Sequence, residues 1–363
     1  MKIPYEDLEK VNAPFMAAFK EAAATVIEKG WYILGQEVEK FEQDFARFHG
    51  AKYAVGVASG LDALRLALMA LELPPQSEVI VSANSYIATV LAVTQAGHIP
   101  VLVDPRLEDG NIDPSKIEAA ITKKTRAIMP VHCYGQPCDM KGIGRIVEQY
   151  GLALIEDCAQ AHNATFQGKM VGTFGDVGAF SFYPTKNLGA LGDAGAIITN
   201  SETLFDKIKS LRNYGEKQKY QNQYLGLNSR LDEIQAAFLN VKLQHLVKIT
   251  EHKRHLADIY YKILRPEWLV SPKRQDALSV YHIFSIRHSK RDALQKYLLE
   301  RGIGTAIHYP TPPYRQAAYE GQFVGEYPVS DEWHTTTLSL PISFGHRTEE
   351  IEYVAKRINE FES

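Results

Sequence analysis

Two ionisable residues, Asp157 and Lys186, are the first candidates for chemistry in this sequence of 363 residues. Asp157 follows the apolar run 152–155, and ligands of open α/β sheets bind at the carboxyl ends of strands. Lys186 follows the apolar segment 177–183, where partial burial would lower its pKa and leave the amine nucleophilic. Their separation of 29 residues leaves room for two strands, so both side chains can meet at one sheet edge. Taken singly, the aspartate could only begin a turn and the lysine could be a solvated loop residue.

A carboxylate and a lysine at such an edge are what pyridoxal phosphate (PLP) needs. The lysine holds the aldehyde as a Schiff base, and the carboxylate keeps the ring nitrogen protonated so that the ring withdraws electrons. Ser59-Gly60-Leu61 begins a helical pattern whose free N–H groups and dipole favour a phosphate, or which is simply a serine-capped helix. Tyr86 lies at a strand-to-helix turn, where its ring could stack on a flat cofactor or pack in the core.

Alternating apolar runs and helical patterns predict the elements that position these residues. Nearly continuous apolar runs are typical of strands covered on both faces, so the sequence indicates an α/β fold with a mostly parallel sheet. After about residue 240 a long, charge-laced helical stretch leads into a mixed α+β pattern. We expect a large domain over 1–245 and a small C-terminal α+β domain over 246–363. The strands expected in the large domain are Tyr53–Val57, Glu78–Val81, Pro100–Val103, Ala127–Val131, Leu152–Glu156 and Gly178–Phe182.

Composition excludes several other classes of protein. The formal net charge is −3, which gives no basic footprint for nucleic acid. No apolar run approaches the roughly 20 residues of a membrane span, and the charged start MKIPYEDLEK lacks a leader's apolar core, so we expect a cytoplasmic protein. The cysteines 133, 138 and 158 form no CxxC pair, so neither a disulfide framework nor a metal site is expected. A nicotinamide dehydrogenase would need GxGxxG after the first strand, which is absent.

Six ordered blocks resemble the DegT/DnrJ/EryC1/StrS family of PLP-dependent sugar aminotransferases. The resemblance extends almost from end to end and implies the aspartate aminotransferase fold, which is fold type I among PLP enzymes. The blocks are GWYILGQEVEKFEQDFARFHG (30–50), the SGLDAL helix start (59–64), PVHCYGQPCDM (130–140), IEDCAQAH (155–162), SFYPTKNLGALGDAG (181–195) and GLNSRLDEIQAA (226–237).

The resemblance implies roles around the cofactor ring. Lys186 would form the internal aldimine and later move a proton, and Asp157 would pair with the pyridine nitrogen. Gln160 would lie near the ring hydroxyl and Tyr86 would stack on the ring. Relatives that are dehydratases have histidine in place of the lysine, so the presence of Lys186 counts against that branch.

The resemblance also implies how the phosphate is held. The backbone at Gly60 and Leu61 and the hydroxyl of Ser181 would bind it, and Asn228 would reach the phosphate in the neighbouring subunit's site. The active unit is therefore expected to be a homodimer with shared sites. The family commonly has Asn-Gly-Thr where this chain has Ser59-Gly60-Leu61, which removes one contact but leaves the backbone cradle.

Substrate residues are indicated more weakly. Tyr183, three residues before Lys186, could point at the sugar or pack in the strand. His308 and Tyr309 lie in the stretch that corresponds to the family's sugar-facing loop. The segment 212–224 carries Arg212 and Lys219 among tyrosines. A substrate diphosphate needs positive charge nearby, and Lys219 is the candidate residue for binding it.

We therefore expect an aminotransferase that converts a dTDP-linked 3-keto-6-deoxyhexose to the 3-amino-3,6-dideoxyhexose, with PLP as cofactor and L-glutamate as donor. Its product would serve O-antigen, lipopolysaccharide or related glycan synthesis. One alternative is C4 amination of a nucleotide-linked 4-keto-6-deoxyhexose. Another is a PLP-binding regulatory protein without turnover, since fold does not fix function. The sequence does not decide whether the C4 hydroxyl of the sugar is axial or equatorial, nor which nucleotide base the sugar carries.

Overall fold

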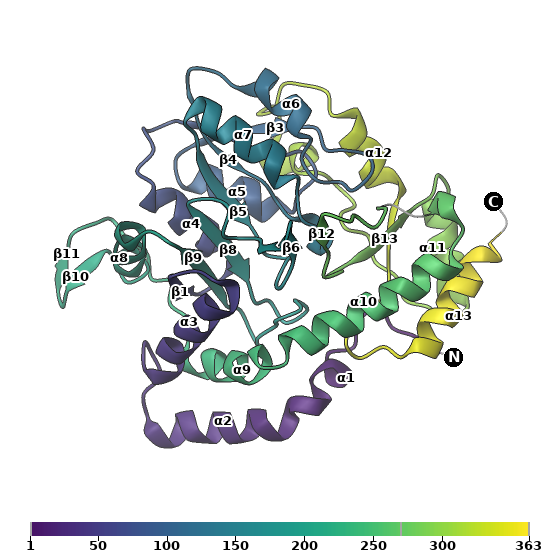
Figure 1. Ribbon diagram of the computed structural model, residues 1–363, viewed down its shortest axis with the longest axis horizontal. Helices are drawn as coiled ribbons and strands as arrows, with labels where there is room; N and C mark the ends of the chain where they lie inside the picture. The colour runs from purple at the N-terminus through teal and green to yellow at the C-terminus, as the bar shows by residue number, and fades with distance from the viewer. Residues whose placement is uncertain (1, 269–270, 362–363) are drawn as a thin grey trace.

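Seven strands form the central sheet in the order β1-β9-β8-β5-β4-β2-β3 (Figure 1). The computed structural model describes residues 2–268 and 271–361. β9 is antiparallel to both of its neighbours, and the other pairings are parallel, so the expected mostly parallel α/β sheet is confirmed. The strands are β1 (Tyr53–Val57), β2 (Glu78–Ser82), β3 (Ile99–Val103), β4 (Thr125–Met129), β5 (Ala153–Asp157), β8 (Val177–Ser181) and β9 (Gly195–Thr199).

The six predicted strands are all present, each within two residues of its predicted bounds. β9 was not predicted; it begins at Gly195 and is buried along its whole length.

Helices cover both faces of the sheet. Along a strand, side chains alternate between the faces: Val55 packs in a cluster with α4 and α5, whereas Ala54 packs with α3 and α9. The helices are α1 (Leu8–Asn12), α2 (Met16–Lys29), α3 (Gln36–His49), α4 (Gly60–Ala70), α5 (Ile87–Gln95), α6 (Pro114–Ile117), α7 (Met140–Tyr150), α8 (Glu202–Leu211), α9 (Glu233–Leu243), α10 (Leu246–Ile263), α11 (Arg291–Glu300), α12 (Pro328–Thr336) and α13 (Thr348–Asn359).

A separate apolar cluster lies at the end of the molecule where α11 and α13 are drawn (Figure 1). It is built from α10, α11, α13 and the antiparallel pair β13 (Phe284–Arg287) and β14 (Thr337–Leu340), with Ile3 added from the start of the chain. The boundary between 1–245 and 246–363 stays a prediction. The remaining strands are β6 (Thr165–Phe166), β7 (Lys169–Met170), β12 (Ala277–Leu278), and the hairpin β10 (Glu216–Gln218) and β11 (Gln221–Asn222).

The long helical stretch expected over 240–264 is broken. α9 ends at Leu243 and α10 begins at Leu246, with His245 at φ −110° and ψ 1° between them. The break lets α9 pack on α2 and α3 while α10 packs on α13 in the separate cluster. Within the described residues, no helix is both long and apolar enough to cross a membrane.

Parallel strands bring their carboxyl ends to one edge of the sheet. Asp157 ends β5, Ser181 ends β8, and the segments after β1 and β2 carry Ser59 and Tyr86 to the same edge. This edge holds the candidate site.

Candidate active site

Asp157 is buried at the end of β5 and held by two donors. The Thr89 hydroxyl donates to Oδ2 at 2.8 Å, and the backbone N–H of Ala159 donates to Oδ1 at 3.1 Å. Burial raises the pKa of the Asp157 carboxyl, while the two hydrogen bonds and the charge of Lys186 oppose that shift. The carboxylate is therefore fixed in orientation and electrostatically coupled to the lysine.

Lys186 lies in a turn after β8, where its N–H donates to the carbonyl of Tyr183 at 2.8 Å. Burial of its ammonium group lowers the pKa of Lys186 to about 8, against the opposing charge of Asp157. The amine is therefore much more readily deprotonated than an ordinary lysine, as a nucleophile requires. The structure thus brings together the two residues on which the sequence argument rests.

The loop before α4 offers a backbone cradle. Ser59 is the N-cap, and its hydroxyl accepts the N–H of Asp62 at 3.2 Å, which leaves the N–H groups of Gly60 and Leu61 free of acceptors in the described structure. A Cβ on Gly60 would lie 2.5 Å from Cβ of Ser181, so only glycine fits there. The Ser181 hydroxyl therefore lies beside two free N–H groups at a helix N-terminus, which favours an anion.

Tyr86, Gln160 and Tyr309 form one group beside Asp157. Tyr86 is half exposed at the N-cap of α5, and its ring centroid lies 5.2 Å from that of Tyr309. The Gln160 amide donates to the Tyr309 hydroxyl at 2.8 Å and accepts the N–H of Tyr134 at 2.5 Å. Gln160 thus joins the loop after β5 to the loop that carries Tyr309.

His308 precedes Tyr309 and is uncharged at neutral pH. Burial, followed by the charge of Lys186, lowers the pKa of His308 to about 4. Its Nδ1 lies 2.9 Å from the hydroxyl of Ser339. The charge of Lys186 acts on His308, so this loop lies near the lysine.

The remaining predicted residues, Tyr183, Lys219 and the phosphate ligand Asn228, lie on other segments of the chain. Tyr183 is about half exposed after β8, and Asn228 is exposed next to the buried Ser229. Lys219 lies in the β10–β11 hairpin, which projects at the left end of the molecule, away from the sheet edge (Figure 1). Arg212 is not available for a diphosphate: it is buried, and it bonds Glu42 and the carbonyl of Gly56.

Three residues of the site were missed from the sequence. Thr89 follows Tyr86 by three positions, which places both on the first turn of α5, so its contact could have been sought once Tyr86 was chosen. Tyr134 and Trp333 are buried, and the Trp333 indole donates to the Tyr134 hydroxyl, which donates to the carbonyl of His308 at 2.8 Å. These contacts join segments far apart in the sequence, and no local pattern indicates them.

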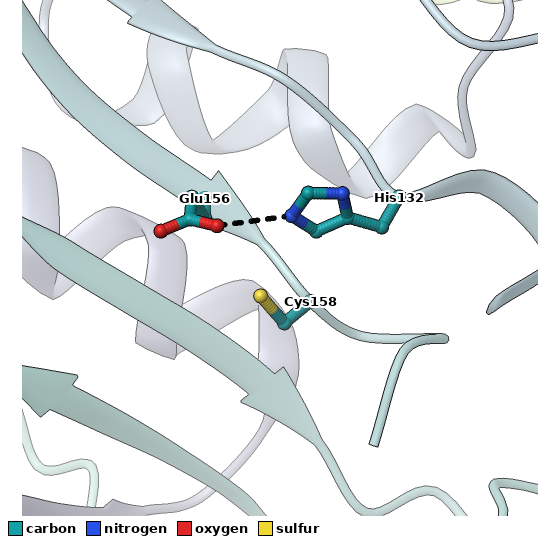
Figure 2. Close-up of side chains that lie close together, drawn as sticks. All are labelled: His132, Glu156 and Cys158. Carbon is teal, nitrogen blue, oxygen red and sulfur yellow. Dashed lines mark hydrogen bonds and ion pairs between the residues drawn. The ribbon is translucent and has the colours of Figure 1, made fainter. Parts of the chain in front are cut away.

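A second buried group, His132, Glu156 and Cys158, lies on and beside β5 (Figure 2). Cys138 N–H donates to Nδ1 of His132, so Nε2 carries the proton and donates to Glu156 at 3.1 Å. The carboxylate also accepts the N–H groups of residues 172, 174 and 175. Burial raises the pKa of the Cys158 thiol well above its usual value. These partners make the group a hydrogen-bonded support for β5.

The residues present fit PLP. One edge of the sheet brings together three features that the cofactor needs. They are a lysine with a lowered pKa, a buried carboxylate at a strand end, and a backbone loop at Gly60 where a Cβ would occupy the space for an anion. Lys186 would hold the aldehyde carbon, Asp157 would face the ring nitrogen, and Gly60, Leu61 and Ser181 would bind the phosphate.

Comparison with known proteins also indicates a PLP-dependent enzyme. The model of the DegT/DnrJ/EryC1/StrS aminotransferase family matches residues 15–359. The dTDP-3-amino-3,6-dideoxy-alpha-D-galactopyranose transaminase of Aneurinibacillus thermoaerophilus is 47% identical over 360 residues, which are 99% of each chain. The structure of DesV from S. venezuelae superimposes with a TM-score of 0.96 at 40% identity over 99% of this chain and 98% of that one. NtdA from Bacillus subtilis, solved with bound PMP, has a TM-score of 0.92 at 30% identity over 99% of this chain and 85% of that one.

Proposed function

The chain belongs to the DegT/DnrJ/EryC1/StrS aminotransferase family and is a PLP-dependent sugar-nucleotide transaminase, and from this premise we propose that it aminates C3 of a dTDP-linked 3-keto-6-deoxyhexose with L-glutamate as donor. The 47% identical relative, whose name gives a dTDP-3-amino-3,6-dideoxygalactose, supports this substrate. Glutamate would leave as 2-oxoglutarate, and the keto oxygen of the sugar would leave as water.

The observation that carries the proposal is that Lys186 and Asp157 lie close enough at the sheet edge for the charge of each to shift the pKa of the other. When bound, PLP supplies an aldehyde that carries the amino group and a ring that withdraws electrons. Lys186 Nζ holds the cofactor and, once released, moves a proton at the reacting carbon of donor and sugar. With a pKa of about 8, this amine can both take up and give back a proton near neutral pH. Asp157, fixed by Thr89, keeps its carboxylate directed at one place throughout.

The sugar would lie against the loop of His308 and Tyr309. His308 is neutral, so it can orient a hydroxyl without attracting an anion to the reacting carbon. The Tyr309 hydroxyl accepts from Gln160 and keeps its own hydrogen for donation to the sugar. Tyr183, about half exposed beside Lys186, would form the opposite wall.

We also propose a homodimer in which each subunit completes the other's site. Asn228 and Lys219 are exposed, so a partner subunit could use them for the cofactor phosphate and the substrate diphosphate. Mixing two inactive variants, Lys186→Ala and Asn228→Asp, tests the sharing. A mixed dimer would have one site with both changes and one intact site, so activity would return to a substantial fraction of the wild type. If mixing restores nothing, the sites are not shared.

The substrate is tested by product analysis. Purified enzyme with glutamate would be given dTDP-3-keto-6-deoxygalactose, dTDP-3-keto-6-deoxyglucose and dTDP-4-keto-6-deoxyglucose in parallel. NMR of the product should place nitrogen on C3 for one of the first two. Nitrogen on C4 from the third alone would replace the proposal with C4 amination, and no transfer to any of them would favour a regulatory role.

A further inference from the structure

The outer edge of β1 is held by side chains instead of by another strand. β1 is at the end of the sheet and pairs on one side with β9. On its open side, the N–H of Gly56 donates to Oε1 of Glu42 at 2.8 Å, and its carbonyl accepts Nη1 of Arg212 at 2.7 Å. Arg212 also bonds the same Oε1 of Glu42. Both backbone groups of one residue are thus bonded to a single ion pair.

Ser229 extends this arrangement toward the cradle. Its hydroxyl accepts the N–H of Ala58 at 3.2 Å, and its own N–H donates to the carbonyl of Arg212 at 2.8 Å. Ser229 is fully buried and Arg212 is only 5% exposed. Glu42, Arg212 and Ser229 are called the clasp below, and its last contact lies two residues before Gly60.

On the side that faces β8 and β9, the loop at Ser59 and Gly60 is packed too closely to move inward. A Cβ on Gly195 would lie 2.4 Å from the carbonyl oxygen of Ser59, and one on Gly60 would lie 2.5 Å from Cβ of Ser181. β8 and β9 therefore abut the loop from within, and the clasp holds it from outside. If the clasp is weakened, the loop can move only outward, away from the Ser181 hydroxyl.

We propose that the clasp is a positioning device for the cofactor phosphate, with Arg212 and Ser229 as positioning residues that act through Ala58 and Gly60. Neither side chain needs to touch the cofactor. They set the place of the two free N–H groups relative to Ser181, and a phosphate bound by fixed donors loses affinity when one of them shifts. Asp157, at the end of β5, and Lys186, in the turn after β8, keep their places.

The test separates phosphate binding from ring binding. Cofactor-free protein would be titrated with PLP and with pyridoxal, which lacks the phosphate, and absorbance of the lysine-bound form would be followed. Lysine is shorter than arginine, so Arg212→Lys draws the charge back from the position of Nη1, the atom that bonds both Glu42 and the carbonyl of Gly56. Ser229→Ala removes the acceptor for the N–H of Ala58. Each variant should bind PLP at least roughly tenfold more weakly, since at least one buried hydrogen bond is lost. Its affinity for pyridoxal should change less than about twofold by the same argument.

Matched controls remove comparable buried contacts elsewhere. Arg291→Lys alters a buried arginine that bonds the carbonyls of His334 and Thr337. Ser77→Ala removes a hydroxyl bonded to the carbonyl of Pro74 at the other end of the sheet. Neither control should change the ratio of the two affinities. Equal weakening of PLP and pyridoxal in the clasp variants, or no weakening of either, would overturn the proposal. If Arg212→Lys does not fold, Ser229→Ala decides alone.

Discussion

The hydroxyl of Thr89 donates a 2.8 Å hydrogen bond to Oδ2 of Asp157, and both groups are buried. A hydrogen bond to a carboxylate favours the charged form, so this contact opposes the rise that burial causes in the pKa of Asp157. Thr89 lies on the first turn of α5 and Asp157 at the end of β5, so the bond also fixes the helix that presents Tyr86 against the sheet edge.

Replacing Thr89 by valine should therefore shift the acid side of the pH–activity profile. Without this hydrogen bond the pKa of Asp157 rises further, so the carboxylate becomes protonated at a higher pH as the solution is acidified. We expect kcat at neutral pH to fall roughly tenfold, the worth of one charge-assisted hydrogen bond, and the acid limb to move upward. Profiles of kcat for the two proteins measure this. An unchanged acid limb would mean that Thr89 does not tune Asp157.

Truncation of Lys186 to alanine should abolish turnover while the protein still binds PLP noncovalently. The amine both holds the cofactor and moves the proton, and proton transfer by a placed side chain alone contributes roughly 10²–10⁴-fold in rate. Assays with glutamate over many enzyme equivalents measure the loss. Lys242→Ala is the matched control, because burial also lowers the pKa of Lys242 to about 8 but its Nζ bonds Asn12 instead. Repeated turnover by Lys186→Ala would contradict the assigned role.

The sequence predicts the site residues that lie next to a local pattern, but not those that act through distant contacts. Asp157, Lys186 and Ser59-Gly60-Leu61 could be found because each stands next to a recognisable apolar run or helix start, and the parallel sheet then brings strand ends together. Thr89, Tyr134 and Trp333 could not, because each acts through a contact with a residue at least 25 positions away. Arg212 shows a further limit: the sequence places this cation in a polar segment, yet it is buried and bonds Glu42, 170 positions away.

The same distinction applies to the fold. Runs with β-branched and apolar residues predicted six strands, but β9 begins at a glycine and its place between β1 and β8 depends on tertiary packing. The break at His245 is likewise set by the two apolar clusters that α9 and α10 join, since both flanking stretches are strongly helical.

Buried Lys186 should cost the cofactor-free protein stability. Its pKa is about 8 when folded against an ordinary value of 10.5, so between these pH values the unfolded chain binds more protons and stability rises with pH. Lys186→Met should be more stable than the wild type by roughly 1–3 kcal/mol at pH 7, and this gain should shrink between pH 8 and 10.5. Urea unfolding at pH 7 and pH 10, at one protein concentration, measures it. A variant less stable at pH 7, or an equal gain at both pH values, would be inconsistent with a buried ammonium.

A methyl group at Gly60 should loosen the cofactor. Its Cβ would lie 2.5 Å from that of Ser181, so the loop must move away from the hydroxyl. Gly60→Ala should lower PLP affinity at least roughly tenfold, because the donors of the cradle no longer converge. Gly144→Ala is the control: that site in α7 has open space, and alanine there should add about 0.5–1 kcal/mol of stability without affecting PLP. Equal PLP affinity of Gly60→Ala and wild type would show that the phosphate is bound elsewhere.

The most direct test of the account is the visible absorbance of the purified, PLP-loaded protein. It is followed first after L-glutamate and then, in separate samples, after dTDP-3-keto-6-deoxygalactose or dTDP-3-keto-6-deoxyglucose. The account predicts a yellow band that bleaches with glutamate as the amino group is taken up, and that returns when the keto-sugar accepts it. A band that ignores glutamate would contradict the donor assignment. A protein that develops no such band with added PLP would show that Lys186 and Asp157 do not form the site.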